Sequence, residues 1–512
     1  MRPQMLLTAL FAVALGCSAD QVTTVIPDTT DVGPVHSGFN VTVDGSSTGD
    51  GSSAHPWSLA TALAQPGIVK PGDTIWVHGG TYAGEFTSNL TGTVTAPIVL
   101  RQFPGERATI DGKLSIVGQY AYYWGLEIMY SDTKRVTSLA GSDPADLPRE
   151  RMTVFVTGPF NKLINLVIHD LGDGLFSGVS GQGIEVYGSV IYNNGWLGPD
   201  RGHGHSVYLQ NRDATKVVRD NVWFGSFSSG LHIYGSDATW LQNFDIQGNT
   251  MFNSGDHVTP EVEIEYWGGA IGSLHNAVYK QNSIYHRDGG SQVVHLNAAG
   301  NPAGEDVEFS GNIVNGTVGF NEMKHYVVTG NKFTSGTTPL GGQSVLIGLR
   351  VPAGVTYSSY VWNSNQYAVP ANSTQDPFYV VNGFGATYKF PAWQTATGYD
   401  GLGAYVSGGF PQADIVVRNN QYEPGRAFIT CWNWNGAAEL NVDLSAVLKS
   451  GESFEIRHIF DLFGTPIVKG VFSGSSVSIP QPRLAPPAPL GYAQPGIMPD
   501  NRFNVFLVTR VK

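Results

Sequence analysis

A short apolar block recurs along the middle of the chain, and it constrains the fold more than any other feature of the sequence. The first residues of its seven copies are Leu166, Ser189, Asn221, Asn249, Asn282, Asn312 and Asn331. The intervals between them are 23, 32, 28, 33, 30 and 19 residues, so the block is constant while the chain between blocks varies in length. A parallel β-solenoid predicts this combination, because each coil returns to the same strand register while its loops lengthen freely.

Asparagine opens most of these blocks and adds a second constraint. Asparagines at equivalent turns of a solenoid can hydrogen-bond from coil to coil, as side-chain ladders do in other stacked β structures. A β-propeller would instead show four strands in each evenly spaced repeat of about 40–50 residues. We therefore expect an all-β chain folded as a parallel β-helix.

The start of the chain carries a second pattern. Its segments are FNVTVDG at 39–45, HPWSLATA at 55–62, PGDTIWVHGGTY at 71–82 and ATIDG at 108–112. In these segments the chain resembles right-handed parallel β-helix proteins of the pectate-lyase-like superfamily, over about residues 39–430. Many members are polysaccharide lyases, such as alginate lyases and chondroitinase B-like enzymes, although hydrolases and epimerases share the scaffold. The resemblance implies a right-handed β-helix that acts on an extracellular polysaccharide.

The first 19 residues are typical of an export signal, with Arg2 ahead of the apolar run Met5–Gly16. That run is shorter than the ~20 residues that span a bilayer, and no later segment is long enough. Cys17 follows a sequence close to a bacterial lipobox, so lipidation at Cys17 and plain cleavage after Ala19 both stay open. We expect an exported protein that is secreted, periplasmic or an outer-membrane lipoprotein.

The rest of the chain divides into three parts. Residues 20–37 form a polar linker, residues 38–425 the β-helix catalytic domain, and residues 426–512 a small β-sandwich-like domain packed on the end of the solenoid. Only Cys431 remains as a thiol of the mature body, so the fold rests on its core rather than on an internal disulfide. The net charge of −12 makes nucleic acid an improbable partner, and we expect an extracellular polysaccharide instead.

A second strand can be aligned from coil to coil, and its alternation predicts an outward row of side chains. The predicted members of this row are Phe176, Tyr208, His232, Gly272 and His295. A Gly-His-Gly-His loop brings His203 and His205 to the same patch, and Tyr234 follows His232 by two residues. The predicted catalytic residues are His232, Tyr208, His205, His203 and Tyr234.

Lytic β-elimination suits these residue types. It removes the proton next to a uronate carboxylate and expels the 4-linked oxygen, so it needs a base, an acid and a cation for the carboxylate. We predict His232 and Tyr208 as the proton-transfer pair, with the histidine as the base and the tyrosine as the acid. The predicted substrate-binding residues are Lys216, Arg201, Arg212, Glu185, Asp200, His295, Tyr266 and Trp267, with the last two in a loop beside the groove.

Two other functions stay open. A glycoside hydrolase on the same scaffold would need a pair of carboxylates, for which the candidates are Glu185, Asp200, Glu261, Glu263 and Glu265. A non-catalytic sugar-binding solenoid is the third possibility. No spacing of residues indicates a metal site, although calcium bound by Asp and Asn on turns would suit the fold.

Overall fold

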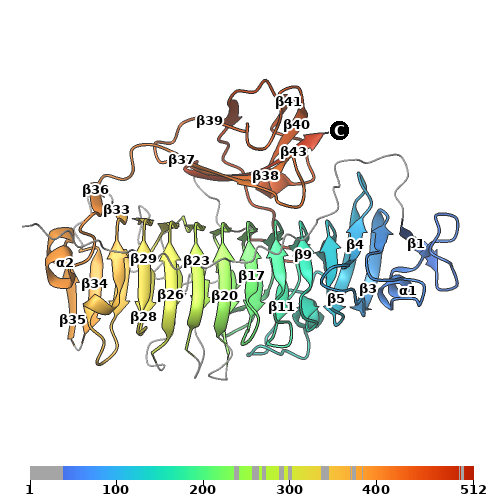
Figure 1. Cartoon of the computed structure of the whole chain (residues 1–512), viewed down its shortest axis with the longest axis horizontal. Helices are drawn as coiled ribbons and strands as arrows, with labels where there is room; N and C mark the ends of the chain where they lie inside the picture. The colour runs from blue at the N-terminus through green and yellow to red at the C-terminus, as the bar shows by residue number, and fades with distance from the viewer. Residues whose placement is uncertain are drawn as a thin grey trace, which may run out of the picture.

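The computed structural model of the chain describes residues 38–235, 241–255, 265–267, 273–287, 293–297, 303–335, 345–369, 371, 376–382, 384–494, 496 and 501–511. A long stack of parallel coils dominates it, and a small antiparallel domain lies along one side of the stack (Figure 1). The predicted all-β parallel β-helix is therefore confirmed. None of the helices in the described part of the chain is long and apolar enough to cross a membrane.

Each full coil contributes a strand to three parallel faces. The first face consists of β1 (Phe39–Ser46), β2 (Thr74–Val77), β4 (Ile98–Gln102), β6 (Ala121–Trp124), β9 (Lys162–Ile164), β12 (Glu185–Tyr187), β17 (Lys216–Arg219), β20 (Gln242–Gln247), β23 (His275–Lys280), β26 (Glu305–Ser310), β29 (Tyr326–Thr329) and β32 (Val361–Asn363). The second face consists of β3 (Gly80–Ser88), β5 (Ala108–Ile116), β8 (Val154–Val156), β11 (Leu175–Ser177), β16 (Val207–Leu209), β19 (Leu231–Ile233), β22 (Glu265–Trp267), β25 (Val294–Leu296), β28 (Val318–Asn321), β31 (Ile347–Arg350) and β34 (Phe378–Asn382), and antiparallel β35 (Phe384–Tyr388) closes it.

The third face contains the recurrent block. Its strands are β7 (Glu127–Met129), β10 (Val167–His169), β13 (Val190–Tyr192), β18 (Val222–Phe224), β21 (Thr250–Phe252), β24 (Ser283–Tyr285), β27 (Ile313–Asn315), β30 (Lys332–Thr334), β33 (Gln366–Val369) and β36 (Ala404–Ser407). Successive copies pair in the same register, for example Val222 with Thr250 and Phe224 with Phe252. The varying intervals between blocks are thus taken up by loops.

The predicted asparagine ladder is present and fully buried. Its members are Asn221, Asn249, Asn282, Asn312, Asn331 and Asn365. The backbone N and Nδ2 of Asn221 both donate to Oδ1 of Asn249 at 3.0 Å, and each later asparagine repeats this pair of bonds one coil on. The ladder ends at Asp400, whose Oδ1 accepts from Asn365 Nδ2 at 2.9 Å. A carboxylate suits this end, because it accepts hydrogen bonds and has no donor to leave unpaired.

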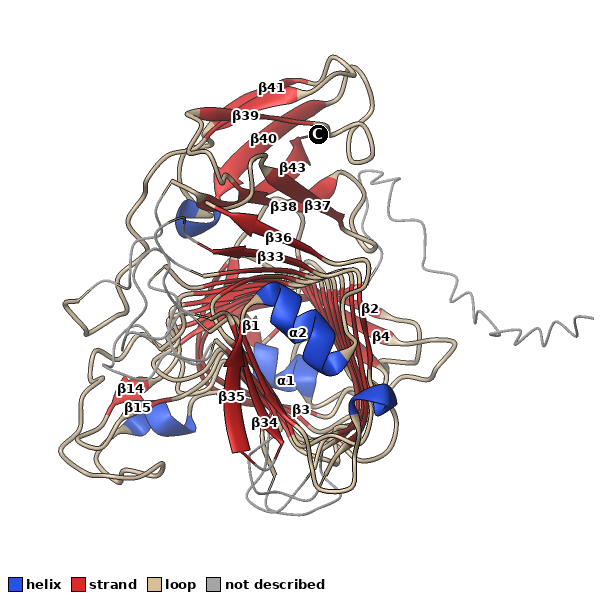
Figure 2. Ribbon diagram, turned by 90° about the vertical axis from the view of Figure 1, so that its left-hand side faces the viewer, coloured by secondary structure: helices blue, strands red, loops and turns tan. Residues whose placement is uncertain are grey.

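Short helices close the two ends of the stack. Ser58 caps α1 (Leu59–Leu63), which buries Leu59, Ala62 and Leu63 against the first coils. At the other end, α2 (Phe390–Thr397) lies across the last coil when the stack is viewed end-on (Figure 2). Trp393 of α2 is fully buried and stacks on Phe378 with ring centroids 4.6 Å apart. Covering the ends removes the open edges that would otherwise pair with other chains.

The C-terminal domain packs on the side of the solenoid, so its predicted place at the end is wrong. Its main sheet has the order β37 (Asp414–Asn419), β38 (Arg426–Trp432), β43 (Phe503–Val511), β40 (Ser453–His458) and β41 (Val468–Val471), with β39 (Glu439–Val442) and β42 (Val477–Pro480) paired beside it. The sheet thus takes its first strand from residues that precede the predicted boundary at 426. Cys431 is buried within it as a free thiol.

Aromatic residues of the third face explain the side-on packing. Three successive copies of the block turn an aromatic side chain outward, and these residues, Phe224, Phe252 and Tyr285, form a continuous stripe on the coils. Trp432 and Phe503 of the C-terminal sheet cover this stripe, with the rings of Tyr285 and Phe503 stacked at 4.4 Å. Removing this apolar area from water favours the side of the solenoid over its end.

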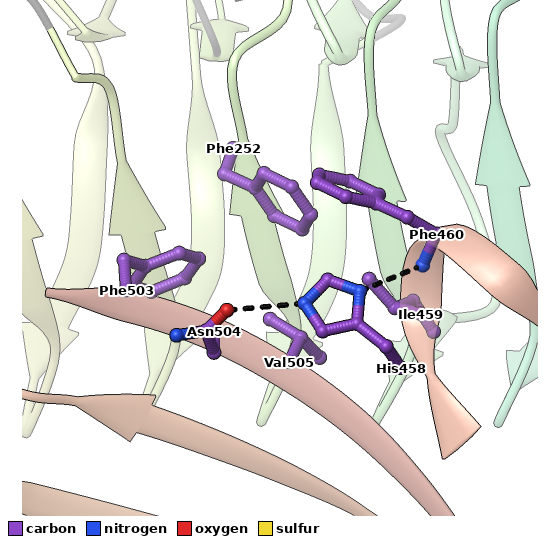
Figure 3. Close-up of a pocket in the computed structure, with 7 residues that line it drawn as sticks. All are labelled: Phe252, His458, Ile459, Phe460, Phe503, Asn504 and Val505. Atoms are coloured by element: carbon purple, nitrogen blue, oxygen red, sulfur yellow. Dashed lines mark hydrogen bonds between the residues drawn. The ribbon is translucent and has the colours of Figure 1, made fainter. Parts of the chain in front are cut away.

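A small pocket marks the same junction (Figure 3). Phe252 of the solenoid meets Phe460 and Phe503 there, and His458 lies beneath them. His458 Nε2 donates to Asn504 Oδ1 at 3.0 Å, while its Nδ1 accepts from the backbone N of Phe460 at 3.1 Å and so caps η4 (Ile459–Asp461). Burial lowers the pKa of His458 to about 4, so the ring is neutral at pH 7.

Candidate functional site

One row of outward residues runs across the second face on consecutive strands, and we call it the outward column. Its members from β8 to β25 are Phe155, Phe176, Tyr208, His232 and His295, and the backbone of Tyr266 takes the register position between the last two. The predicted pairing of Phe176 with Tyr208 and of Tyr208 with His232 is confirmed. These three side chains are half-buried, whereas their neighbours along each strand point into the core.

The predicted place of Gly272 in this row is wrong. Tyr266, not Gly272, aligns with His232 on one side and His295 on the other. Gly272 lies outside the described residues. Alternation along a strand is a local property, but which segment of a coil becomes the strand depends on the length of its loops.

Three residues that precede these strands form a second row, which we call the edge column. Asp173, His205 and Ser229 each stand two positions before a strand, and the strands pair Leu175 with Val207 and Val207 with Leu231. The backbone N of His205 donates to Asp173 Oδ1 at 2.8 Å. The site is therefore a patch of two columns on three coils.

The aromatic rings of the patch are in direct contact. His205 and His232 stack with centroids 4.1 Å apart and planes 9° from parallel. Tyr208 meets His232 edge to face at 4.8 Å, and Tyr234 stacks on the same histidine at 5.3 Å. The structure thus brings four of the five predicted catalytic residues together.

Ser229 contacts both stacked histidines. His205 Nδ1 lies 3.0 Å from the Ser229 carbonyl oxygen and 3.0 Å from Ser229 Oγ. Ser229 Oγ also lies 3.3 Å from His232 Nδ1. Neither Ser229 nor Asp173 was predicted from the sequence; the signal for both was their shared place two residues before aligned strands.

Burial sets the protonation states in the patch. It lowers the pKa of His205 to about 4 and lowers the pKa of His232 well below its usual value, and the positive charge of Arg201 acts in the same direction. Burial together with the negative charge of Asp173 raises the pKa of Tyr208 to about 12. The pKa of Asp173 itself rises to about 6 through burial. At neutral pH the site therefore holds two neutral imidazoles beside a protonated phenol.

His203 does not join the patch. It belongs to the hairpin of β14 (Trp196–Leu197) and β15 (Gly202–His203), where its ring stacks on Trp196 at 5.2 Å. Its Nε2 pairs with Asp200 Oδ1 at 3.1 Å, and its side chain is only 2% exposed. His203 and Asp200 therefore stabilise the loop that delivers His205.

Among the predicted cations, Arg201 remains available to a ligand. Its side chain is 54% exposed, pairs with Asp200 at 3.5 Å, donates to Ser142 Oγ at 2.9 Å and lies close enough to the histidines to affect their pKa. Arg212 is exposed and pairs with its neighbour Asp213 at 3.2 Å. Of the two, Arg201 is the one whose charge reaches the patch.

Lys216 does not face a groove. Its position on β17 alternates inward, next to Phe244 on the following coil, and the residue is fully buried. Its Nζ donates to the carbonyl oxygens of Ser177 and Gly178 at 2.9 and 2.8 Å and to Ser177 Oγ at 2.6 Å. Lys216 therefore satisfies buried acceptors and has no direct path to a substrate carboxylate.

Glu185 also does not face the patch, because other residues engage its carboxylate. Its two oxygens accept from Lys162, Gln421 and Tyr422 at 2.8 Å each, so it ties the first face to the turn between β37 and β38 of the C-terminal domain. In the described part of the chain, no three His, Cys, Asp or Glu side chains gather as the ligands of a metal ion would.

The residues predicted to lie in a loop beside the groove belong to a strand. Glu265, Tyr266 and Trp267 form strand β22 rather than part of a loop. Trp267 shares its register with the fully buried Ile233 and Leu296, while Tyr266 shares that of the half-buried His232 and His295. Glu261 and Glu263 lie outside the described residues.

No protein-family model and no curated protein matches the chain. Similar solved structures include a lacto-N-biosidase from Eubacterium ramulus, with 12% identity over 72% of this chain and 66% of that one, at a TM-score of 0.44. A rhamnogalacturonan lyase matches at 13% identity over 69% and 86%, at 0.43, and a pectate lyase at 18% over 66% and 81%, at 0.34. At these identities the likeness concerns the fold and assigns no activity to the chain.

Proposed function

We propose that the chain is an exported enzyme that cleaves an acidic, uronate-containing polysaccharide by β-elimination. The contact between Tyr208 and the stacked His205 and His232 carries this proposal. Elimination needs a base that is unprotonated at neutral pH and an acid that is still protonated. The lowered pKa values of the histidines and the raised pKa of Tyr208 supply both within one patch.

These residues provide a group for each step of the elimination. A neutral histidine takes the proton from the carbon next to the uronate carboxylate, and the electron pair of that C–H bond forms the new carbon–carbon double bond. The bond to the 4-linked oxygen breaks, and Tyr208 protonates the departing oxygen. Arg201 would bind the carboxylate, where a cation stabilises the negative charge that develops during proton removal.

The surroundings of the patch also suit a sugar polymer. Phe155 and Phe176 continue the outward column with rings stacked 5.4 Å apart, and aromatic faces are common platforms for sugar rings. Adjacent coils are about 4.8 Å apart, so a chain that lies along the column meets a new side chain at each coil. The export signal predicted at residues 1–19 would bring such an enzyme to the place where these polymers occur; that segment lies outside the described residues.

A glycoside hydrolase is the second candidate, and Asp173 is the observation that favours it. Its pKa of about 6 suits a carboxylic acid that protonates a leaving group. A hydrolase needs a second carboxylate about 5–9.5 Å away, and Glu185 and Asp200 are engaged by other residues.

One experiment separates the two reactions. The purified protein is incubated with soluble polyuronates and with a neutral glucan as control, and products are followed by ultraviolet absorbance, a reducing-end assay and mass spectrometry. Elimination yields an absorbing unsaturated uronate that weighs one water less than the hydrolysed product. New reducing ends without absorbance would favour hydrolysis, and no turnover on any polymer would contradict both enzymes.

A further inference from the structure

We infer that Ser229 is a positioning residue that holds the two stacked histidines in opposite neutral tautomers. In this arrangement His205 carries its proton on Nδ1 and keeps a lone pair on Nε2, whereas His232 carries its proton on Nε2. The tautomers follow from the hydrogen bonds, and their use in catalysis rests on the proposed function.

The tautomer of His205 follows from the carbonyl group of Ser229. A carbonyl oxygen accepts hydrogen bonds and never donates them. Because His205 Nδ1 lies 3.0 Å from that oxygen, Nδ1 must carry the proton. A neutral imidazole has one N–H, so the lone pair of His205 is on Nε2.

The tautomer of His232 follows from the hydroxyl group of the same serine. The proton on His205 Nδ1 already points toward Ser229, so Ser229 Oγ receives a hydrogen bond from that side at 3.0 Å. Its own proton is then directed to His232 Nδ1, 3.3 Å away. If His232 Nδ1 were also a donor, the proton of the buried Ser229 hydroxyl would have no acceptor among the described residues, which costs about 1–3 kcal/mol.

The ring stack favours two neutral rings, whose tautomers the hydrogen bonds to Ser229 then set. Two protonated imidazoles at 4.1 Å would repel each other in a partly buried site. The charged and titratable groups around the pair are Asp173, Arg201, His203, Tyr208 and Tyr234. Ser229 thus joins two neutral rings by one directed chain, from His205 Nδ1–H through the serine hydroxyl to His232 Nδ1.

The arrangement gives the histidines different tasks. His205 is the proton acceptor, because its Nε2 lone pair is held in place by the bond on the opposite ring nitrogen. His232 presents an N–H, which suits donation to the substrate carboxylate or to a sugar hydroxyl. This differs from the sequence-based prediction, in which His232 was the base.

Nuclear magnetic resonance of the full chain tests the tautomers directly. Long-range proton–nitrogen correlations of protein labelled with nitrogen-15 histidine distinguish the two ring nitrogens, and His205→Gln and His232→Gln assign the signals. At pH 7 we expect an Nδ1–H pattern for His205 and an Nε2–H pattern for His232. An Nδ1–H pattern for His232 in the unmodified protein would overturn the inference without any variant.

Three variants of two serines test the role of the hydroxyl. Ser229→Ala keeps the carbonyl, so His205 should retain its tautomer while His232 shifts to a mixture; Ser229→Thr should restore the original pattern. Ser226→Ala is the matched control, because Ser226 lies on the same loop and bonds to Ser206 at 2.6 Å. Unchanged signals for both histidines in Ser229→Ala would refute the role of Ser229.

Kinetics connect the tautomers to the reaction. Ser229→Ala should lower kcat by about 10- to 100-fold, the range for residues that orient a functional histidine, with KM nearly kept and Ser229→Thr active. If no polyuronate is cleaved, the proposed function fails while the spectra still decide the tautomers. If a polyuronate is cleaved but the spectra disagree, only the present inference fails.

Discussion

His205 and His232 stack with ring centroids 4.1 Å apart, although they belong to successive coils and reach the patch from different places on them. His205 stands in the turn before β16, and His232 stands in the middle of β19. Their contact joins the edge column to the outward column, so a single sugar unit could meet a base, an N–H donor and the Tyr208 phenol together.

Removing the proton-transfer groups should abolish turnover without unfolding the chain. We expect Tyr208→Phe and His205→Gln each to lower kcat by about 10²–10⁴-fold, the usual contribution of a general acid or base. Tyr122→Phe on the first face is the control and should keep full activity. Thermal unfolding by circular dichroism checks the fold, and more than about a tenth of normal turnover in either variant would contradict the assignment.

The acid limb of the profile of kcat/KM against pH should lie at an unusually low pH. The base must be neutral, so kcat/KM is lost as pH falls through the pKa of His205, about 4, rather than near 6.5. Tyr208 must be protonated, and with a pKa of about 12 it imposes no alkaline limb below about pH 9. Arg201→Gln removes a positive charge beside the histidines, so their pKa values should rise and the acid limb should move to higher pH. Asp173→Asn shows whether any inflection near pH 6 belongs to that carboxyl group.

Lys216 should matter for stability and not for substrate affinity. Lys216→Met removes the donor to the buried carbonyl group of Ser177 and the partly buried one of Gly178. Leaving a buried acceptor unpaired costs about 1–3 kcal/mol. We expect a lower urea midpoint with an unchanged KM, whereas Arg201→Gln should raise KM and leave the midpoint alone. If Lys216→Met raised KM without lowering the urea midpoint, Lys216 would have to be assigned to substrate binding after all.

The end of the asparagine ladder should be sensitive to a single atom change. Asp400 accepts hydrogen bonds from Asn365, from Tyr367 Oη at 2.7 Å and from Trp393 Nε1 at 3.3 Å. Asp400→Asn turns one acceptor into a donor facing these donors, so we expect about 1–3 kcal/mol lower stability and faster amide exchange in the last coils. Asp306→Asn at an exposed site is the control, and equal exchange in both variants would contradict this account.

The junction between solenoid and C-terminal domain should weaken in acid. His458 has a folded pKa of about 4 against about 6.5 when unfolded, so the unfolded chain binds the extra proton between these values. The contribution is complete above about pH 6.5 and is lost as pH falls toward about 4, by at most about 3 kcal/mol. Between pH 7 and 4 the free energy of unfolding should fall less steeply in His458→Gln than in the unmodified protein. His325→Gln, at an exposed site, is the control and should show the pH dependence of the unmodified protein.

The sequence by itself determined the solenoid, the buried asparagine ladder and the pairing of Phe176, Tyr208 and His232. These features depend on alternation within a strand and on a block that every coil must repeat, and both are local properties of the chain. The same two local properties determined that Tyr208 and His232 would be neighbours.

Only the tertiary structure decided the rest of the site. Loop lengths differ from coil to coil, so Tyr266 rather than Gly272 takes the register position between His232 and His295. Asp173, His205 and Ser229 align only once the strands are paired. Lys216 is buried because its strand turns it inward, and the C-terminal domain lies on the side of the solenoid because the stripe of Phe224 and Phe252 must be covered. Each outcome depends on contacts between segments distant in sequence, whose free energies no local pattern specifies.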